Sequence, residues 1–225
     1  MRIAALTVLV LLATGCSLTT NGKPHPVPDA LPTTAPSAPP TTATAAPPER
    51  GAAFDDVAAW VRAGIPADPA RYGTATTDDG VATPLHGDIA FTSPTGKIKC
   101  ISAFQDGLDG LSCLVELRNP PERPAGSPNG NWVPNWIDYS GAELTVGSLH
   151  GDPGAFVRGF GPVLPYGNRV SVKDITCRAD TAGVFCVRTS TRSAVRISDA
   201  GVLPFGCLRE QGPDPKQALG QAFRC

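Results

Sequence analysis

The chain has 225 residues, 17% of them charged, and a formal net charge of −1 at neutral pH. Because its charge is balanced and its basic residues form no dense cluster, the composition disfavours a nucleic-acid-binding protein. Seven cysteines raise the question of disulfide bonding, and the count is odd.

The N-terminus has the pattern of an export signal. Arg2 carries a single positive charge, residues 3–13 form an apolar run, and small residues precede Cys16. This pattern is typical of a secretory signal peptide. The apolar run is too short for a membrane span, which needs about 20 residues.

The end of this signal, Ala13-Thr14-Gly15-Cys16, resembles the lipobox of bacterial lipoproteins, although that motif usually has Leu where Ala13 stands. The resemblance implies that residues 1–15 are removed and that Cys16 becomes a lipidated N-terminus at the outer face of the cell membrane. The membrane is therefore the first expected partner, since two or more acyl chains give stable anchoring. The alternative is an ordinary cleaved signal that happens to contain a cysteine.

Residues 16–50 are predicted to form a disordered tether. Residues 17–50 include nine prolines and seven threonines but no aromatic residue. Such a segment cannot offset the entropy cost of ordering. At about 3.1 Å per residue, it would reach at most about 100 Å from the anchor. The Thr/Pro composition is also that of O-glycosylated stalks, which is a second reading of the same segment.

Residues 51–225 are predicted to form one extracytoplasmic, β-rich domain. A short helix is expected at residues 53–63, because Phe54, Val57, Ala58 and Val61 follow helical spacing. Beyond Asp88, short apolar runs alternate with Gly/Pro turns, which predicts a mostly β fold, a single antiparallel sandwich or open barrel. The expected strands are residues 89–91, 98–101, 112–117, 144–146, 170–172, 175–178, 184–188 and 194–197.

Six cysteines remain once Cys16 is set apart, and an even set in an oxidising compartment indicates a disulfide framework. Cys100 and Cys113 flank one predicted hairpin, and Cys177 and Cys186 flank another of similar sequence. Facing residues of a hairpin lie close enough for a disulfide. We therefore expect the pairs Cys100–Cys113, Cys177–Cys186 and, for the remaining two, Cys207–Cys225. The similarity of the hairpins indicates either two related halves or a coincidence.

The segment Phe91-Thr92-Ser93-Pro94-Thr95-Gly96-Lys97-Ile98-Lys99-Cys100 resembles a signature of uncharacterised secreted and lipid-anchored actinobacterial proteins. Leu164-Pro165-Tyr166-Gly167, followed by Ile175-Thr176-Cys177 and Gly183-Val184-Phe185-Cys186, resembles a second signature of that family. The sequence departs from the family at Thr191–Val195, where a Gly-His-Gly-Phe-like stretch often stands. The resemblance implies location and fold but no activity.

Trp132, Trp136 and Tyr139 are the candidate binding residues. They would form a surface for a cell-wall glycan or an envelope protein, unless the rings pack into the core. His86-Gly87-Asp88 and His150-Gly151-Asp152 each place a histidine near an acid, but no nucleophile motif accompanies them. The three histidines are scattered and no close Cys pair is present, so we expect no metal site and no cofactor. We expect a non-enzymatic binding domain; the alternative is an envelope hydrolase with a His/Asp site.

Overall fold

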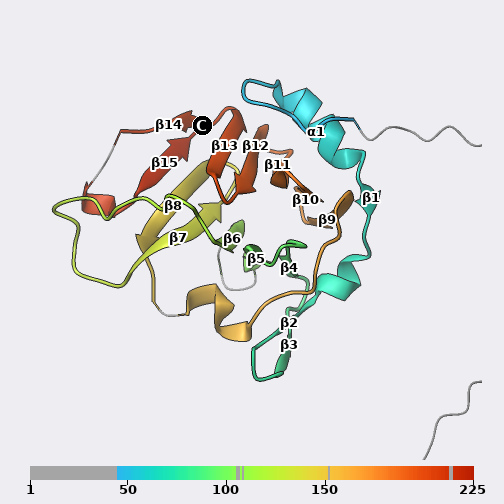
Figure 1. Ribbon diagram of the computed structural model, residues 1–225, viewed down its shortest axis with the longest axis horizontal. Coiled ribbons are helices and arrows are strands. Elements are labelled where there is room, and N and C mark those ends of the chain that lie inside the picture. The colour runs from blue at the N-terminus through green and yellow to red at the C-terminus, as the bar shows by residue number, and fades with distance from the viewer. Residues whose placement is uncertain (1–44, 105–106, 108, 152, 213–214) are drawn as a thin grey trace, which may run out of the picture. The chain divides into compact units, whose positions relative to one another are not determined.

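The computed structural model describes residues 45–104, 107, 109–151, 153–212 and 215–225 (Figure 1). They belong to one compact unit that runs from Thr44 to Cys225. The signal segment, Cys16 and most of the expected tether lie outside the described residues. The last residues of that tether are described, and the indole N–H of Trp60 donates a hydrogen bond of 2.8 Å to the carbonyl of Ala45. The folded unit therefore includes residues just before Gly51.

The predicted helix is confirmed as α1, which spans Phe54–Arg62. Its apolar side packs on the outer face of a β-sheet, where Trp60 lies 4.7 Å from the ring of Phe185. At its C-terminal end, Arg178 donates a hydrogen bond of 2.6 Å to the carbonyl of Trp60. A cation at this end is favourable, because the last carbonyls of a helix carry partial negative charge.

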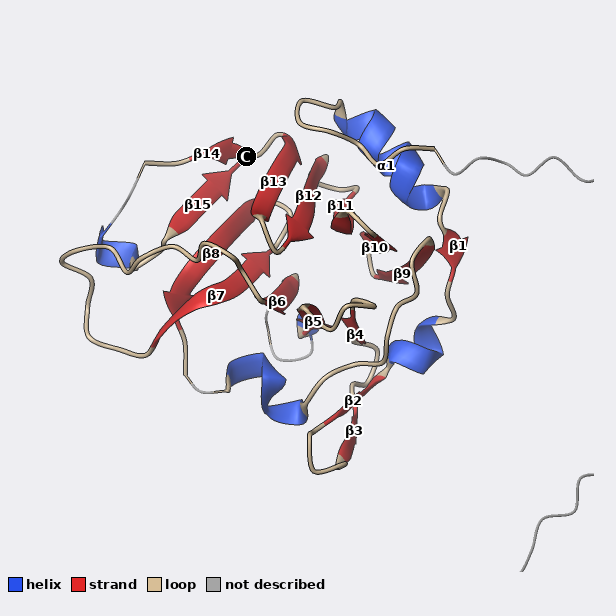
Figure 2. Cartoon of the chain, in the orientation of Figure 1, coloured by secondary structure: helices blue, strands red, loops and turns tan. Residues whose placement is uncertain are grey.

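Figure 2 shows that strands make up most of the regular structure. A six-stranded sheet contains β1 (Ile65–Pro66), β9 (Asn168–Val172), β10 (Ile175–Asp180), β11 (Gly183–Arg188), β12 (Ser193–Ser198) and β13 (Gly201–Gly206), in this order. A seven-stranded sheet contains β14 (Arg209–Glu210), β15 (Gln221–Arg224), β8 (Glu143–Leu149), β7 (Trp132–Tyr139), β6 (Leu111–Val115), β5 (Ile98–Ser102) and β4 (Ala90–Thr92). Outside them lie the hairpin of β2 (Thr74–Thr76) and β3 (Ala82–Pro84) and the short helices η1 (Pro69–Tyr72), η3 (Gly154–Arg158) and η4 (Pro215–Gln217).

The two sheets contain the same arrangement of strands. β4 to β8 and β9 to β13 are each five consecutive antiparallel strands (Figure 1). In both, a disulfide joins the second strand to the third: Cys100 faces Cys113, and Cys177 faces Cys186. The Cα–Cα distance is 4.1 Å in each pair. The similarity of the two hairpins in the sequence is therefore a repeat of structure.

The inner faces of the sheets share one hydrophobic core, and both hairpin disulfides are buried in it. The third predicted disulfide, Cys207–Cys225, is also present. Cys207 follows β13 and Cys225 follows β15, so this bond joins one sheet to the other. Three disulfides are typical of a domain that folds in an oxidising, extracytoplasmic compartment.

The fold class predicted from the sequence is confirmed: the structure is mostly β, with mainly antiparallel strands and one short α-helix in the described residues. Each of the eight predicted strands overlaps an observed one. The predicted strands did not include β7 and β13, nor the short strands β1, β2, β3, β14 and β15. β7 and β13 contain Pro134 and Pro204, and proline is disfavoured inside a sheet. Pro134 lies where the pairing of β7 with β8 shifts register, and Pro204 lies on an edge strand. Within the described residues, no helix has the length and apolar character needed to cross a membrane.

Candidate functional site

The structure does not bring the three candidate aromatic residues together on an exposed surface. Trp136 and Tyr139 are 3% and 1% exposed, and Trp132 is half-buried. Successive side chains of a strand point to opposite faces, so residues three apart in β7 are on different sides. Tyr139 belongs to the core between the sheets, whereas Trp136 packs on the outer face of the seven-stranded sheet.

Asp138 lies two residues after Trp136 and shares its face of β7. One carboxylate oxygen, Oδ1, accepts hydrogen bonds from the hydroxyl of Ser112 at 2.6 Å and from the indole N–H of Trp136 at 2.8 Å. Ser112 is the residue directly opposite Asp138 on β6. The ladder between β6 and β7 therefore fixes the orientation of the carboxylate.

His150 follows β8 and completes this cluster. Its imidazole stacks on Trp136, with ring centroids 3.8 Å apart and planes inclined by 22°. Its Nε2 lies 3.4 Å from Oδ2 of Asp138, an ion-pair distance without hydrogen-bond geometry. The acid beside His150 is thus Asp138 from the neighbouring strand. Asp152, the acid that follows His150 two residues later in the sequence, lies outside the described residues.

The order of these groups differs from that of a nucleophile and its base. In a catalytic triad the imidazole lies between the hydroxyl and the carboxylate, so that it can remove the hydroxyl proton. Here the carboxylate of Asp138 lies in the middle, and the Ser112 hydroxyl donates to it. The cluster therefore holds a carboxylate in a fixed position, where it can accept hydrogen bonds from a ligand.

Asp138 borders a surface groove, which we call the Asp138 groove. Asp138 and Ser140 border two adjoining hollows, of about 160 Å³ towards β6 and about 500 Å³ towards β15. The groove has a mixed lining, with the polar residues Asp109, Ser112, Asp138, Ser140, Glu143, Thr145, Gln217 and Arg224 beside the apolar residues Leu111, Tyr139 and Leu219. Arg224 forms an ion pair of 2.8 Å with Glu143 and donates to the side-chain oxygen of Gln217 at 2.9 Å. Carboxylate, amide, guanidinium and hydroxyl groups therefore all line the groove.

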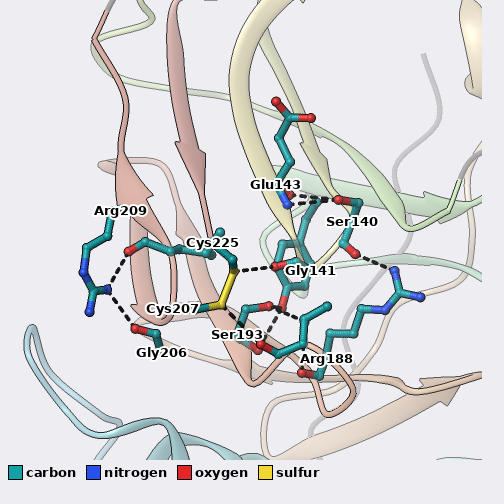
Figure 3. The surroundings of a disulfide bond; sticks show 12 residues. Ser140, Gly141, Glu143, Arg188, Ser193, Gly206, Cys207, Arg209 and Cys225 are labelled. Carbon is teal, nitrogen blue, oxygen red and sulfur yellow. Dashed lines mark hydrogen bonds between the residues drawn. A yellow bond between two sulfur atoms is a disulfide. The ribbon is translucent and has the colours of Figure 1, made fainter.

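The inter-sheet disulfide lies beside the turn that contains Ser140, with Sγ of Cys225 3.5 Å from the carbonyl oxygen of Gly141 (Figure 3). Arg188 on β11 donates to the carbonyl of Ser140 and forms ion pairs of 3.0 Å with Asp109 and 3.1 Å with Asp174. The hydrogen bond to Asp109 raises the pKa of Arg188 above its ordinary value, although burial opposes this shift. Next to Ser140, Gly141 has a φ of +85°, and a Cβ there would lie 2.3 Å from Cδ of Arg188. Only glycine fits this turn without displacing Arg188.

The two members of the other histidine motif differ in burial. His86 is exposed, whereas Asp88 is buried and accepts hydrogen bonds from Ser102 and the backbone N–H of Phe104. In the part of the chain that the structure describes, no group of three or more His, Cys, Asp or Glu side chains is placed to hold a metal ion.

Sequence reasoning missed Asp138 and Ser112 as site residues. Asp138 and Ser112 lie on neighbouring strands. Because Trp136 and Asp138 are two residues apart, strand alternation predicts that their side chains face the same way. No strand was predicted in this stretch, which contains Pro134, and proline is disfavoured inside a sheet. Comparisons with family models, with curated proteins and with solved structures found no match for this chain.

Proposed function

We propose that this chain is an exported protein held by a lipid on Cys16 at the outer face of the cell membrane, where its β domain binds a cell-wall glycan in the Asp138 groove. The family of secreted and lipid-anchored actinobacterial proteins that its signatures resemble is, in this proposal, its own family.

The lipid anchor is supported by the pairing of the cysteines. The other six are joined in three disulfides, which leaves Cys16 as the unpaired member of an odd set. Cys16 also stands where an apolar signal ends and a Pro/Thr-rich segment begins. Acylation of this residue accounts for both features.

The anchor is tested by expressing wild-type and Cys16→Ser chains in an actinobacterial host and separating membranes from soluble material. We expect the wild type with the membranes and the variant in the soluble fraction. Equal partition of the variant with the membranes would place the anchor elsewhere. Extraction with a mild detergent distinguishes a lipid anchor from adsorption.

One observation supports glycan binding: a carboxylate fixed by Ser112 and Trp136 lines both hollows of the groove. A charged acceptor forms stronger hydrogen bonds with hydroxyl donors than a neutral acceptor does. Among the lining residues Arg224 is the only cationic side chain and is already paired with Glu143, so the groove offers no basic cluster for a polyanion. A hydroxyl-rich chain is the ligand whose chemistry matches these groups.

The binding test is sedimentation of the mature Cys16→Ser protein with purified cell-wall glycan. Asp138→Asn removes the charge but keeps the shape, and we expect it to weaken binding about tenfold or more, because a hydrogen bond to a charged group contributes about 1.5–3 kcal/mol. Asp56→Asn, on the exposed side of α1, is the matched control. Unchanged binding by a normally folded Asp138→Asn protein would refute the site.

A hydrolase is the second candidate, because His150 contacts Asp138 and such a pair can activate a water molecule. Incubation of the protein with the same glycan, followed by assay of new reducing ends, separates the two functions. Release of reducing ends that is abolished by His150→Ala would favour the hydrolase. Binding without release favours the binding protein.

A further inference from the structure

A second pocket lies between loops of both sheets. It has a volume of about 130 Å³, and its lining residues are distinct from those of the Asp138 groove. It is bordered by the turn between β4 and β5, the turn between β10 and β11, the turn between β12 and β13, and Tyr166. Loops that a β-sandwich holds in place are frequent positions for binding residues.

The signature segments of the sequence meet at this pocket. Ser93, Thr95 and Lys97 come from the first signature, whereas Tyr166 and Gly183 come from two separate segments of the second. Tyr166 is about 70 residues from the first segment along the chain, but all three border the same cavity. The need for tight turns explains the Gly and Pro residues of these segments. It does not explain why the segments lie around the same pocket.

Tyr166 differs from the other two tyrosines of the chain. Tyr72 and Tyr139 are buried, and their hydroxyls donate to the carbonyls of Val163 and Ser193. Tyr166 is 42% exposed and borders the pocket. An exposed aromatic ring with a polar tip offers a flat contact surface for a ligand.

The charges around the pocket are close to balanced. Lys97 forms an ion pair of 3.2 Å with Asp199, and Arg118 approaches the other oxygen of that carboxylate at 3.5 Å. Asp180 adds a second carboxylate to the lining. With both signs present in so small a space, a ligand of high net charge is disfavoured.

The pocket walls are held rigidly. The hydroxyl of Ser93 accepts from the backbone N–H of Ile98 at 3.1 Å, and the carboxylate of Asp180 accepts from the N–H of Ala182 at 2.9 Å. Gly183 has a φ of +131°, and a Cβ there would lie 2.3 Å from the carbonyl oxygen of Ile197. A preorganised site loses little entropy when a ligand binds.

We propose that this pocket binds one neutral, hydroxylated six-membered ring, a pyranose unit of an envelope glycan. The volume is below the range of about 300–1,000 Å³ that is usual for larger ligands, and it is close to the 150 Å³ that accommodates a benzene ring. The ring stacks on Tyr166, and its hydroxyls bond to Asp180, Asp199 and Lys97. This site is independent of the Asp138 groove and stands whether or not the groove binds glycan.

The test is a titration of the ¹⁵N-labelled mature Cys16→Ser chain with the methyl α-pyranosides of glucose, mannose and galactose, followed by NMR. We expect at least one of them to shift the amides of residues 93, 95–97 and 180–183 saturably. Tyr166→Ala should weaken that affinity about tenfold, whereas Tyr166→Phe should retain most of it, because the ring supplies the contact. Val157→Ala, at another exposed apolar residue, is the control.

Two results would overturn the proposal: no saturable shift with any of the three pyranosides at tens of millimolar, or equal affinity in the wild type and a folded Tyr166→Ala protein. Asp138→Asn, which alters the groove, should leave the saturable shifts of the amides at this pocket unchanged, because Asp138 does not border it. A loss of pyranoside binding at this pocket is thereby distinguished from a loss of glycan binding in the Asp138 groove.

Discussion

The hydroxyl of Tyr139 lies 2.8 Å from the hydroxyl of Ser193 and donates to the Ser193 carbonyl at 2.9 Å. Tyr139 is on β7 and Ser193 is on β12, so this contact connects the two sheets through the core. Ser193 in turn lies 2.9 Å from the hydroxyl of Thr191. Beside this chain of hydroxyls, Cys207–Cys225 connects the same two sheets covalently.

Tyr139→Phe removes this connection while keeping the ring. We expect the free energy of unfolding to fall by about 1–2 kcal/mol, because a buried hydrogen bond is lost and its partner is left less satisfied. Urea denaturation followed by tryptophan fluorescence measures the change. Tyr166→Phe is the matched control, since Tyr166 is exposed, and it should unfold at the wild-type urea concentration.

The same residue predicts a loss of stability at alkaline pH. Burial raises the pKa of the Tyr139 hydroxyl well above its ordinary value, and the hydrogen bond to Ser193 only partly opposes this. The folded state therefore holds the proton more tightly than the unfolded state. Stability from this group is complete below pH about 10, the ordinary tyrosine pKa, and falls as the pH rises further. Urea midpoints of wild type and Tyr139→Phe at pH 8 to 11 should converge as the pH rises; a constant difference would contradict this assignment.

The three disulfides should differ in their resistance to reduction. Cys100–Cys113 and Cys177–Cys186 are at most 1% exposed, whereas Cys225 is exposed and Cys207 is half-buried. Because reduction requires access to a sulfur, a mild thiol reductant should open Cys207–Cys225 first. Alkylation of the native protein followed by mass spectrometry identifies the order. Earlier alkylation of either hairpin pair would show that the core opens more readily than its burial implies.

Gly141→Ala is expected to destabilise the protein more than Gly51→Ala. Both glycines have nearly the same positive φ, +85° and +86°, so both substitutions introduce a similar backbone strain of about 1–2 kcal/mol. Only the Cβ at position 141 would also collide with Arg188, since nothing lies within 4 Å of one at position 51. We expect Gly141→Ala to lower the free energy of unfolding by about 1–3 kcal/mol more than Gly51→Ala does, and this difference measures the cost of the clash with Arg188. Equal values would mean that Arg188 moves aside without cost.

Local pattern in the sequence was sufficient for the helix, for most strands of the two sheets and for the disulfide pairing. These predictions used information that is local in the sequence: the helical spacing around Val57 and the short distance between facing residues of a hairpin. The third disulfide followed from the even number of six cysteines. The local information predicts α1 and Cys177–Cys186 without any knowledge of how the sheets meet. It does not predict β7, whose Pro134 lies at a register shift that depends on its pairing with β8.

The sites depended on tertiary structure, because their members are distant along the chain. The sequence pairs His150 with Asp152, but sheet pairing brings it to Asp138, and the alternation of β7 sends Trp136 and Tyr139 to opposite faces. The signature segments around Ser93 and Tyr166 come together only where turns of both sheets meet. A linear sequence does not specify such contacts by itself, since each one depends on the register of several strands at once.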